Sequence, residues 1–269
     1  MWASHVTALR ALQTVVPVFE GAGIETLAVK GVVTAHLLYA DPNHRPLSDV
    51  DLRIRREDYE RAIRIAEREG WRITERMPEY GAFVVFVGSL GLSVDVETVV
   101  GAPGYCAVSI GEMLSRATRT VLGAEIRVPE IHDHAVLMCV NVFKDKIVLA
   151  PPWSLEDARR IVAVEGFDVD RFVERARRAK IACIAWMVAD WMEREKGSAV
   201  WSAVKARLGG ERGPRRFYAW ALRWLYERGA TSMSTRIMVR AGADDPRMWL
   251  DCLWAAFRHE MARGRSMGP

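Results

Sequence analysis

Hydrophobic positions in the first half of the chain follow two alternating periods. Val6, Leu9 and Leu12 recur at helical spacing, whereas Leu47–Arg55 alternates polar and apolar side chains as a strand with one buried face does. Gly88–Gly91 stands between two β-like runs and predicts a hairpin. The pattern predicts helices at Ser4–Glu20, Val32–Ala40 and Arg56–Glu69, and strands at Thr26–Val29, Leu47–Arg55, Trp71–Thr74, Ala82–Val87, Leu92–Val99 and Thr120–Val128.

From Pro129 onward only the helical period persists. Eight of the ten tryptophans lie in this half, which indicates packing between helices. We therefore predict an α/β (α+β) fold, with a small mixed β-sheet and flanking helices over residues 1–128 and an all-helical domain over 129–269. The helices expected in the second half lie near residues 130–143, 153–165, 168–178, 180–195, 198–208, 214–228, 231–241 and 246–262.

Composition excludes several classes of protein. Among 269 residues, 50% are hydrophobic and 27% are charged, which argues against a disordered, collagen-like or coiled-coil chain. No apolar run reaches the roughly 18 residues that a membrane span needs, and the start of the chain lacks the pattern of a signal peptide. These features predict a soluble, cytoplasmic protein with no membrane contact. The four widely spaced cysteines form no Cys-x-x-Cys pair and are expected to be reduced.

The net charge of +4 is compatible with a nucleotide or nucleic-acid partner without requiring one. More informative is the segment Ser48-Asp49-Val50-Asp51-Leu52. On a strand, Asp49 and Asp51 project from the same face, while Val50 and Leu52 face a core. Two carboxylates at this spacing repel each other unless a cation such as Mg²⁺ neutralises them. A solvated strand face is the other interpretation.

A second strand carries further acids. Leu92–Val99 contains Asp95 and Glu97 on one face. If this strand pairs near Asp49 and Asp51, three carboxylates converge, which is enough to hold the two metal ions of a phosphoryl-transfer site. If it does not, Asp95 and Glu97 face water on an edge strand.

A third feature is Val29-Lys30-Gly31, a short strand that ends in lysine and glycine before a helix. Glycine permits a close approach of the backbone, and a helix N-terminus offers N–H groups to an anion. Lys30 adds a positive charge for a phosphate. The segment is not a Walker A loop, because Gly-x-x-x-x-Gly-Lys-Ser/Thr is absent.

Taken in order, these motifs resemble the bacterial family of uncharacterised nucleotidyltransferases, within the superfamily of DNA polymerase β type. The resemblance covers residues 5 to about 100 well and residues 130–195 loosely, and its specific part is the Arg-Pro-x-Ser-Asp-x-Asp run. The residues that carry it are Leu27-Ala28-Val29-Lys30-Gly31, Leu38-Tyr39-Ala40-Asp41-Pro42, Arg45-Pro46-Leu47-Ser48-Asp49-Val50-Asp51-Leu52 and Val94-Asp95-Val96.

The resemblance implies a role for each of these acids. Asp49 and Asp51 are implied to ligate both metal ions, and Asp95 to ligate one ion and help deprotonate the acceptor hydroxyl. The helical second domain is implied to shape the acceptor site. The residues implied to lie at the triphosphate are Lys30, Gly31, Arg45 and Ser48.

The chain departs from the family pattern at several positions. Glu97 stands where relatives commonly have histidine, and it either adds a fourth carboxylate or alters the acceptor. Arg53 and Arg55 stand where relatives tend to be apolar. His134 and Asp157 form a candidate orienting pair in the loosely similar segment, with a plain core or surface role as the alternative.

We predict a nucleotidyltransferase that uses Mg²⁺, or Mn²⁺, to move a nucleoside monophosphate from an NTP, in the first place ATP, to an acceptor hydroxyl or phosphate. The acceptor class stays open between a small molecule, a peptide or protein, and RNA. Two alternatives also stay open: a catalytically silent binding or regulatory module with the same fold, and a toxin-like enzyme that modifies transfer RNA, which would account for the positive charge.

Overall fold

The structure is a computed structural model that describes residues 2–101, 104–144, 152–209, 220, 221, 224 and 244–266. Contacts within the chain divide it into two compact units. The first unit comprises residues 1–99 and 109–130, and the second comprises 100–108 and 131–269. Because residues 100–108 belong to the second unit, the first unit is made of two separate stretches of sequence.

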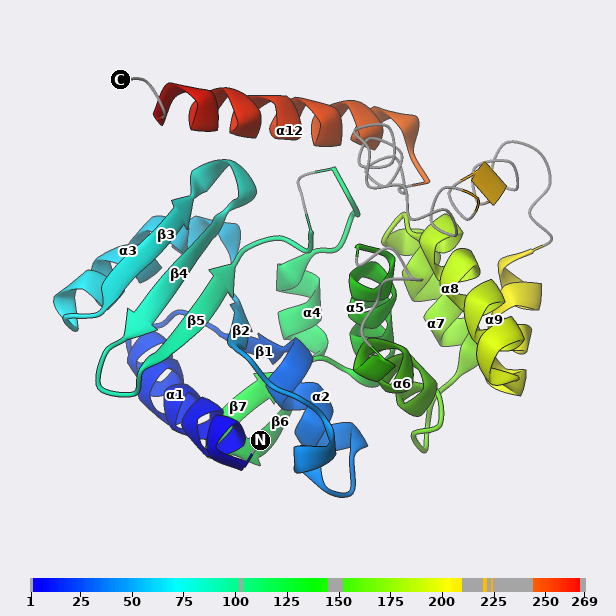
Figure 1. Ribbon diagram of the computed structural model, residues 1–269, viewed down its shortest axis with the longest axis horizontal. Coiled ribbons are helices and arrows are strands. Elements are labelled where there is room, and N and C mark those ends of the chain that lie inside the picture. Colours follow the sequence, from blue (N-terminus) through cyan, green and yellow to red (C-terminus); the bar gives the residue numbers. More distant parts are fainter. Residues whose placement is uncertain are drawn as a thin grey trace. The chain divides into compact units, whose positions relative to one another are not determined.

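The first unit alternates helices and strands as the hydrophobic pattern predicts (Figure 1). Three single turns of 3₁₀ helix, at Pro42–His44, Arg56–Asp58 and Pro78–Tyr80, join some of these elements. In chain order the helices and strands are α1 (Trp2–Gly21), β1 (Leu27–Val29), α2 (Lys30–Leu38), β2 (Val50–Arg53), α3 (Tyr59–Arg68), β3 (Arg72–Met77), β4 (Ala82–Val87), β5 (Leu92–Glu97), α4 (Ile110–Arg116), β6 (Thr118–Leu122) and β7 (Ala124–Val128).

Five strands form a mixed sheet in the order β1-β2-β5-β4-β3. β2 and β5 are parallel, and the other neighbours are antiparallel. β4 and β5 form the predicted hairpin, and β6 and β7 form a separate two-stranded ladder around Gly123, whose φ of 76° suits glycine. The predicted fold class, a small mixed sheet with flanking helices, is confirmed.

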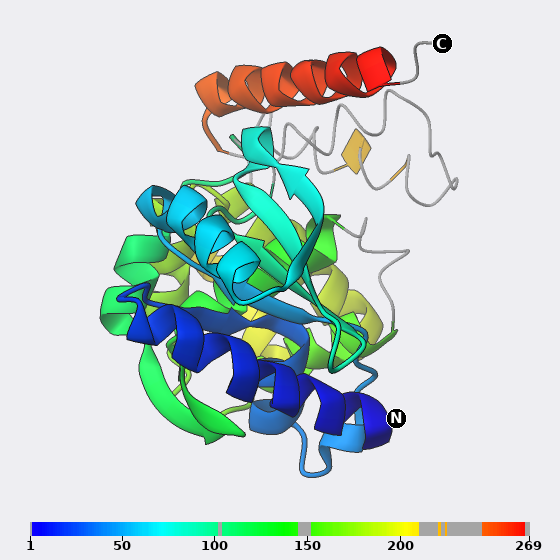
Figure 2. The same cartoon turned by 90° about the vertical axis from the view of Figure 1, so that its left-hand side faces the viewer.

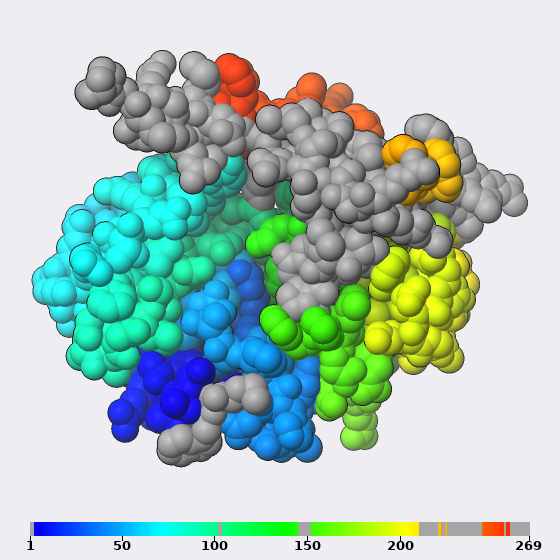
Figure 3. Space-filling model, in the orientation of Figure 1, coloured from blue at the N-terminus to red at the C-terminus, as the bar shows by residue number. Residues whose placement is uncertain are grey.

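One face of the sheet is the core of this unit. α1 contacts β2 and β5, α3 contacts β3 and β4, and Figure 2 shows both helices on the same side of the sheet. Val50 and Leu52 of β2 are fully buried on this face, as are Val94 and Val96 of β5. Because strand side chains alternate, the residues between them project from the opposite face. In the space-filling view of Figure 3, side chains of α1 (dark blue), α2 (lighter blue) and β3–β5 (cyan to blue-green) form the visible surface of this unit.

The limits of some elements differ from those that the sequence predicts. β2 begins at Val50 and not at Leu47, because its antiparallel neighbour β1 ends at Val29 opposite Asp51 and the chain then turns into α2. α2 begins two residues earlier than predicted, at Lys30. The seven-residue helix α4, capped by the Ser109 side chain, is too short for a periodic pattern and was not predicted.

Every element that the structure describes between residues 131 and 266 is a helix. The predicted helices at 214–228 and 231–241 lie almost wholly outside the described residues. The described helices are α5 (Ile131–Lys144), α6 (Pro152–Ile161), α7 (Val169–Arg178), α8 (Ala182–Lys196), α9 (Ala199–Leu208) and α12 (Pro246–Ser266).

The tryptophans of the second unit are buried to different degrees. Trp201 is fully buried and donates its indole N–H to the Ala158 carbonyl at 2.9 Å. Five others are 37% to 59% exposed, so each of them is only partly covered. Among the α12 side chains that the structure describes, Cys252 and Ala255 are buried, whereas Trp249 and Trp254 are partly exposed. The exposed tryptophans are Trp153, Trp220, Trp224, Trp249 and Trp254.

Candidate active site

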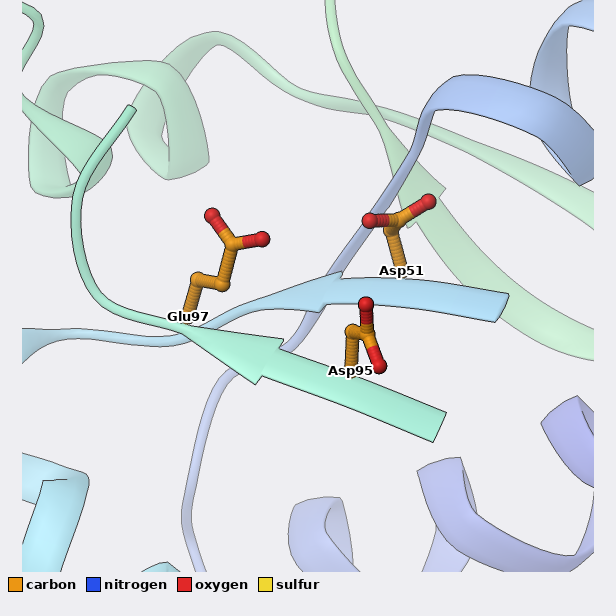
Figure 4. A group of neighbouring side chains, drawn as sticks. All are labelled: Asp51, Asp95 and Glu97. Atoms are coloured by element: carbon orange, nitrogen blue, oxygen red, sulfur yellow. The ribbon is translucent and has the colours of Figure 1, made fainter. Parts of the chain in front are cut away.

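The candidate site lies on the sheet face opposite the core, where β2 and β5 run side by side. The parallel register sets Asp51 opposite Asp95 and Arg53 opposite Glu97. One oxygen from each of Asp51, Asp95 and Glu97 lies within 4.8 Å of the others, and Figure 4 shows the three side chains on the same side of the two strands. We call these three residues the carboxylate cluster.

Asp49 stands next to the carboxylate cluster without being one of its three members. It is half-buried, directly before β2, and it accepts a hydrogen bond from the Ser48 hydroxyl at 3.0 Å. Its negative charge contributes to raising the pKa of both Asp51 and Asp95. The structure therefore brings Asp51 and Asp95 together as the sequence predicts, keeps Asp49 within electrostatic reach, and adds Glu97.

Two cationic side chains face the carboxylate cluster. Lys30, the first residue of α2, donates to Asp51 Oδ1 through a short contact, and its Nζ lies 3.5 Å from Glu97 Oε1. Arg53 Nη1 lies 2.8 Å from Glu97 Oε2. Arg53 is 2% exposed, and within the part of the chain that the structure describes its Nε has no hydrogen-bond partner. Glu97 is thus held between two cations, one at each carboxylate oxygen.

Burial and mutual repulsion raise the pKa of two acids in the cluster. The pKa of Asp95 rises from 3.8 to about 6, first because the carboxyl is partly buried and then because of the charges of Asp51 and Asp49. Burial also raises the pKa of Asp51, although Lys30 and Arg53 oppose this shift. Such perturbed acids grouped on one face are typical of sites that bind cations or move protons.

The pKa of Lys30 is raised as well. Burial by itself lowers this pKa, but the charges of Asp51 and Glu97 outweigh the effect. Lys30 therefore carries a full positive charge at neutral pH, within the carboxylate cluster. The donors of the cluster are hard carboxylate oxygens, which Mg²⁺ and Mn²⁺ prefer, and they already surround a cation. The residues present therefore fit a divalent metal ion.

Gly31 and Arg45 approach each other at the start of α2. A Cβ on Gly31 would lie 2.6 Å from Leu47 Cδ1 and 3.0 Å from Arg45 Nη1, so only glycine fits without moving these side chains. Arg45 Nη1 also donates to the Pro46 carbonyl at 2.9 Å. The predicted anion-binding residues Lys30, Gly31 and Arg45 thus gather around one helix N-terminus, while Ser48 lies exposed beside Asp49.

The candidate pair His134 and Asp157 lies in the second unit, on α5 and α6, and both residues are buried. Neighbouring His132 accepts a hydrogen bond at Nε2 from the backbone N–H of Asp168 at 2.9 Å, which gives that histidine a structural role. None of the four cysteines forms a disulfide within the part of the chain that the structure describes, and three of them are buried.

Arg53 belongs to the site, but the sequence analysis does not place it there. Its position in the sequence carried a signal, because a residue two positions after Asp51 on a strand faces the same side. Arginine is almost never fully buried without a partner, so a buried Arg53 requires a carboxylate beside it. The partner is Glu97, and only the register of β2 against β5 shows this pairing.

Comparison with known proteins identifies the family to which the chain belongs. A family model described as an uncharacterised nucleotidyltransferase matches residues 3–194. No curated protein matches the sequence. Among the described helices, none is long and apolar enough to cross a membrane.

Several solved structures are similar at low sequence identity. A crystal structure of ANT(2″)-Ia in complex with adenylyl-2″-tobramycin shares 17% identity, with a TM-score of 0.46 over 64% of this chain and 98% of that chain. The solution structure of the antibiotic-resistance factor ANT(2″)-Ia shares 18% identity, with a TM-score of 0.45 over 64% and 90%. An antigenic nucleotidyltransferase-like protein from Paracoccidioides brasiliensis shares 15% identity, with a TM-score of 0.42 over 74% and 92%. Because the family model spans well over half of the 269 residues, the chain belongs to the family of uncharacterised nucleotidyltransferases and is an enzyme of nucleotidyl transfer.

Proposed function

We propose that the protein transfers a nucleoside monophosphate from an NTP, with ATP as the first candidate, to a hydroxyl or phosphate of its acceptor, and that it needs Mg²⁺ or Mn²⁺. The observation that carries this proposal is the register of β2 and β5, which sets Asp51 opposite Asp95 and brings their carboxylate oxygens and that of Glu97 within 4.8 Å of each other. Family membership supports the reaction class.

Asp49, Asp51 and Asp95 are the proposed metal ligands, and Glu97 is well placed to be a further one. When bound, a divalent ion neutralises charge on the phosphates and orients the α-phosphate for in-line attack. Asp51 is the most buried of these acids, so its orientation is fixed by the sheet. Asp49 lies before the strand and is less constrained, which allows it to adjust to a second ion.

Asp95 is the proposed general base. Its pKa of about 6 leaves it ionised at neutral pH while making it a stronger base than an ordinary carboxylate. In the transfer, the acceptor oxygen forms a bond to the α-phosphorus, the bond from the α-phosphorus to the bridging oxygen breaks, and pyrophosphate leaves. The acceptor proton passes to the Asp95 carboxylate and then to solvent.

The N-terminus of α2 is the proposed triphosphate site. Lys30, Gly31 and Arg45 combine a helix N-terminus, a close backbone approach and two cations, all of which favour an anion. Ser48 is proposed to assist there through its hydroxyl. Residues 1–128 form the proposed catalytic domain, and 129–269 the proposed helical domain that shapes the acceptor site.

A thermal-shift screen tests the proposal. Metal-free protein is heated with each of the four NTPs, with Mg²⁺, with Mn²⁺ and with each combination. A ligand that binds the folded state raises the melting temperature, so we expect a modest rise with the metal alone and the largest rise where an NTP and a metal are present together. Release of pyrophosphate in the same mixtures is then measured for turnover.

The Asp51→Asn variant should lose both the metal-dependent shift and pyrophosphate release. Glu125→Gln is the matched control, because Glu125 is an exposed carboxylate of the same unit that pairs with Arg119 at 2.7 Å and is not part of the carboxylate cluster. A full NTP shift that survives in Asp51→Asn contradicts the proposal. Binding without turnover in the wild type, even with candidate acceptors present, would instead identify a silent binding module.

A further inference from the structure

Lys30 combines a backbone conformation and a side-chain contact that are unusual for lysine. Its φ is +53°, in the left-handed region that residues with a Cβ rarely adopt. Its ammonium group contacts Asp51 and lies 3.5 Å from Glu97 Oε1. A glycine would make the same turn without strain, so the backbone alone gives no reason for lysine at this position.

The positive φ of Lys180, by contrast, is explained by local backbone structure. Lys180 is the other residue with a Cβ and a positive φ in the described chain, at +57°. It follows the last turn of α7, and the Ile181 N–H returns to the Ala176 carbonyl at 2.9 Å, which is the ordinary hydrogen-bonding of a helix C-terminus. Lys30 instead begins a helix after a strand, and its contacts are with residues of β2 and β5.

The two cations at the carboxylate cluster differ in their freedom to move. Arg53 is 2% exposed, lies within β2 and is fixed by the strands on both sides. The Lys30 side chain is 22% exposed and ends a flexible four-carbon stem at the edge of the site. Arg53 is therefore a permanent neighbour of Glu97, whereas the ammonium of Lys30 can leave.

We propose, on the basis of the metal-dependent function above, that Lys30 is a displaceable internal cation, a positioning residue that holds Asp51 and Glu97 in place until a divalent metal ion replaces its ammonium group. Without the Lys30 ammonium, the buried carboxylate of Asp51 would face Asp95 and Glu97 with Arg53 as the remaining compensating charge. With Lys30 present, the ligand oxygens are arranged before the metal arrives. The released ammonium then lies beside the N-terminus of α2, where the triphosphate is proposed to bind.

The direct test follows the reactivity of the Lys30 amine in the wild-type protein. The full chain is treated briefly with an amine-acylating reagent, without metal and with saturating Mg²⁺, and acylation at each lysine is measured by peptide mass spectrometry. We expect acylation of Lys30 to rise severalfold with Mg²⁺. Lys205, which is paired with Asp190 and Glu193 in the second unit, should not change and is the internal reference.

The second test measures metal affinity by titrating Mn²⁺ into metal-free protein and following free Mn²⁺ by electron paramagnetic resonance. Lys30→Met removes the competing cation and should bind Mn²⁺ about tenfold more tightly, while its metal-free form melts at a lower temperature than the wild type. Lys205→Met is the matched control, because it removes a lysine from another carboxylate pair and should leave Mn²⁺ affinity unchanged.

The outcomes separate the two proposals. If the wild type binds no Mn²⁺, the proposed function fails, and this inference fails with it. If the wild type binds Mn²⁺ but Lys30 acylation stays constant or falls, the proposed function stands and the displacement of Lys30 is wrong. Weaker Mn²⁺ binding by Lys30→Met also overturns the inference. If Lys30→Met does not fold without metal, the acylation experiment on the wild type still tests whether the metal displaces Lys30.

Discussion

Replacing Asp95 by asparagine should stabilise the metal-free protein while destroying its metal site. The carboxyl of Asp95 is partly buried and lies among the charges of Asp51, Asp49 and Glu97, which together raise its pKa from 3.8 to about 6. Asparagine has nearly the same shape and carries no charge. The substitution therefore removes a repulsion that the folded chain tolerates for its function.

The size of the effect follows from the pKa of Asp95. A folded-state pKa of about 6 against 3.8 in the unfolded chain corresponds to about 3 kcal/mol of unfavourable free energy once the acid is ionised. Because Asp95 keeps partial contact with solvent, screening reduces the expected gain of Asp95→Asn to about 1–2 kcal/mol at pH 8.

The dependence on pH has a definite sign. Between pH 3.8 and about 6 the folded state holds the Asp95 proton more tightly than the unfolded chain does. Its favourable contribution is complete below pH 3.8 and is lost as pH rises through 6. When the pH is lowered from 8 to 5, the free energy of unfolding of the wild type should therefore rise by about 1 kcal/mol more than that of Asp95→Asn.

The assay is urea unfolding of both proteins in a chelator at pH 5 and pH 8, followed by circular dichroism. Repeating the pH 8 measurement with Mg²⁺ should stabilise the wild type and leave Asp95→Asn almost unchanged. If the variant is less stable than the wild type at pH 8 without metal, or if both show the same pH dependence, the repulsion inferred for this cluster is wrong.

Three further substitutions test other parts of the structure. Gly31→Ala places a Cβ against the flexible end of Leu47 and should change stability by less than about 1 kcal/mol, but it should raise the Kd for NTP severalfold in a titration with Mg²⁺; an unchanged Kd would argue against a triphosphate site there. Asp168→Ala removes the N-cap of α7 and should cost about 1 kcal/mol in urea unfolding, and no loss would refute the cap. Trp201→Phe leaves the Ala158 carbonyl of α6 without its indole donor and should cost about 2 kcal/mol. The control Trp191→Phe should cost less, because Trp191 is only partly buried and its indole nitrogen has no hydrogen-bond partner among the described residues.

Most of the first unit follows from local pattern. Alternation of polar and apolar residues identified β2 and β5, whose apolar side chains face the core, whereas β4 is an uninterrupted apolar run. The helical period identified α1 and α3, which pack on the core face of the sheet. α4 was missed because two turns of helix carry too few positions for a period. The start of β2 was set too early because the end of β1 depends on a turn at Lys30 with positive φ, which propensity does not predict.

The site was predictable in part. The spacing of Asp49 and Asp51, and of Asp95 and Glu97, showed which acids share a face, since side chains alternate on any strand. The sequence does not show which strands are neighbours or in what register. That register sets Asp51 opposite Asp95 and pairs Arg53 with Glu97, and a shift by one residue would send these side chains to the opposite face.

In the second unit, amino-acid composition does not predict which helix faces are buried. Tryptophan content indicated packing between helices, and Trp201 does pack in this way, with its ring at a right angle to that of Phe172. The exposed Trp249 and Trp254 on α12 show that apolar content alone does not tell which face of a helix is buried. That choice depends on contacts between segments far apart in the sequence.

The central claim is that carboxylates on two parallel strands hold a divalent metal ion for nucleotidyl transfer. The most direct measurement is a crystal structure with Mn²⁺ and a non-hydrolysable NTP, in which anomalous scattering locates the manganese. We expect a manganese ion coordinated by Asp51 and Asp95, with the triphosphate at the N-terminus of α2. Nucleotide bound with manganese elsewhere, or with none at these two carboxylates, would contradict it.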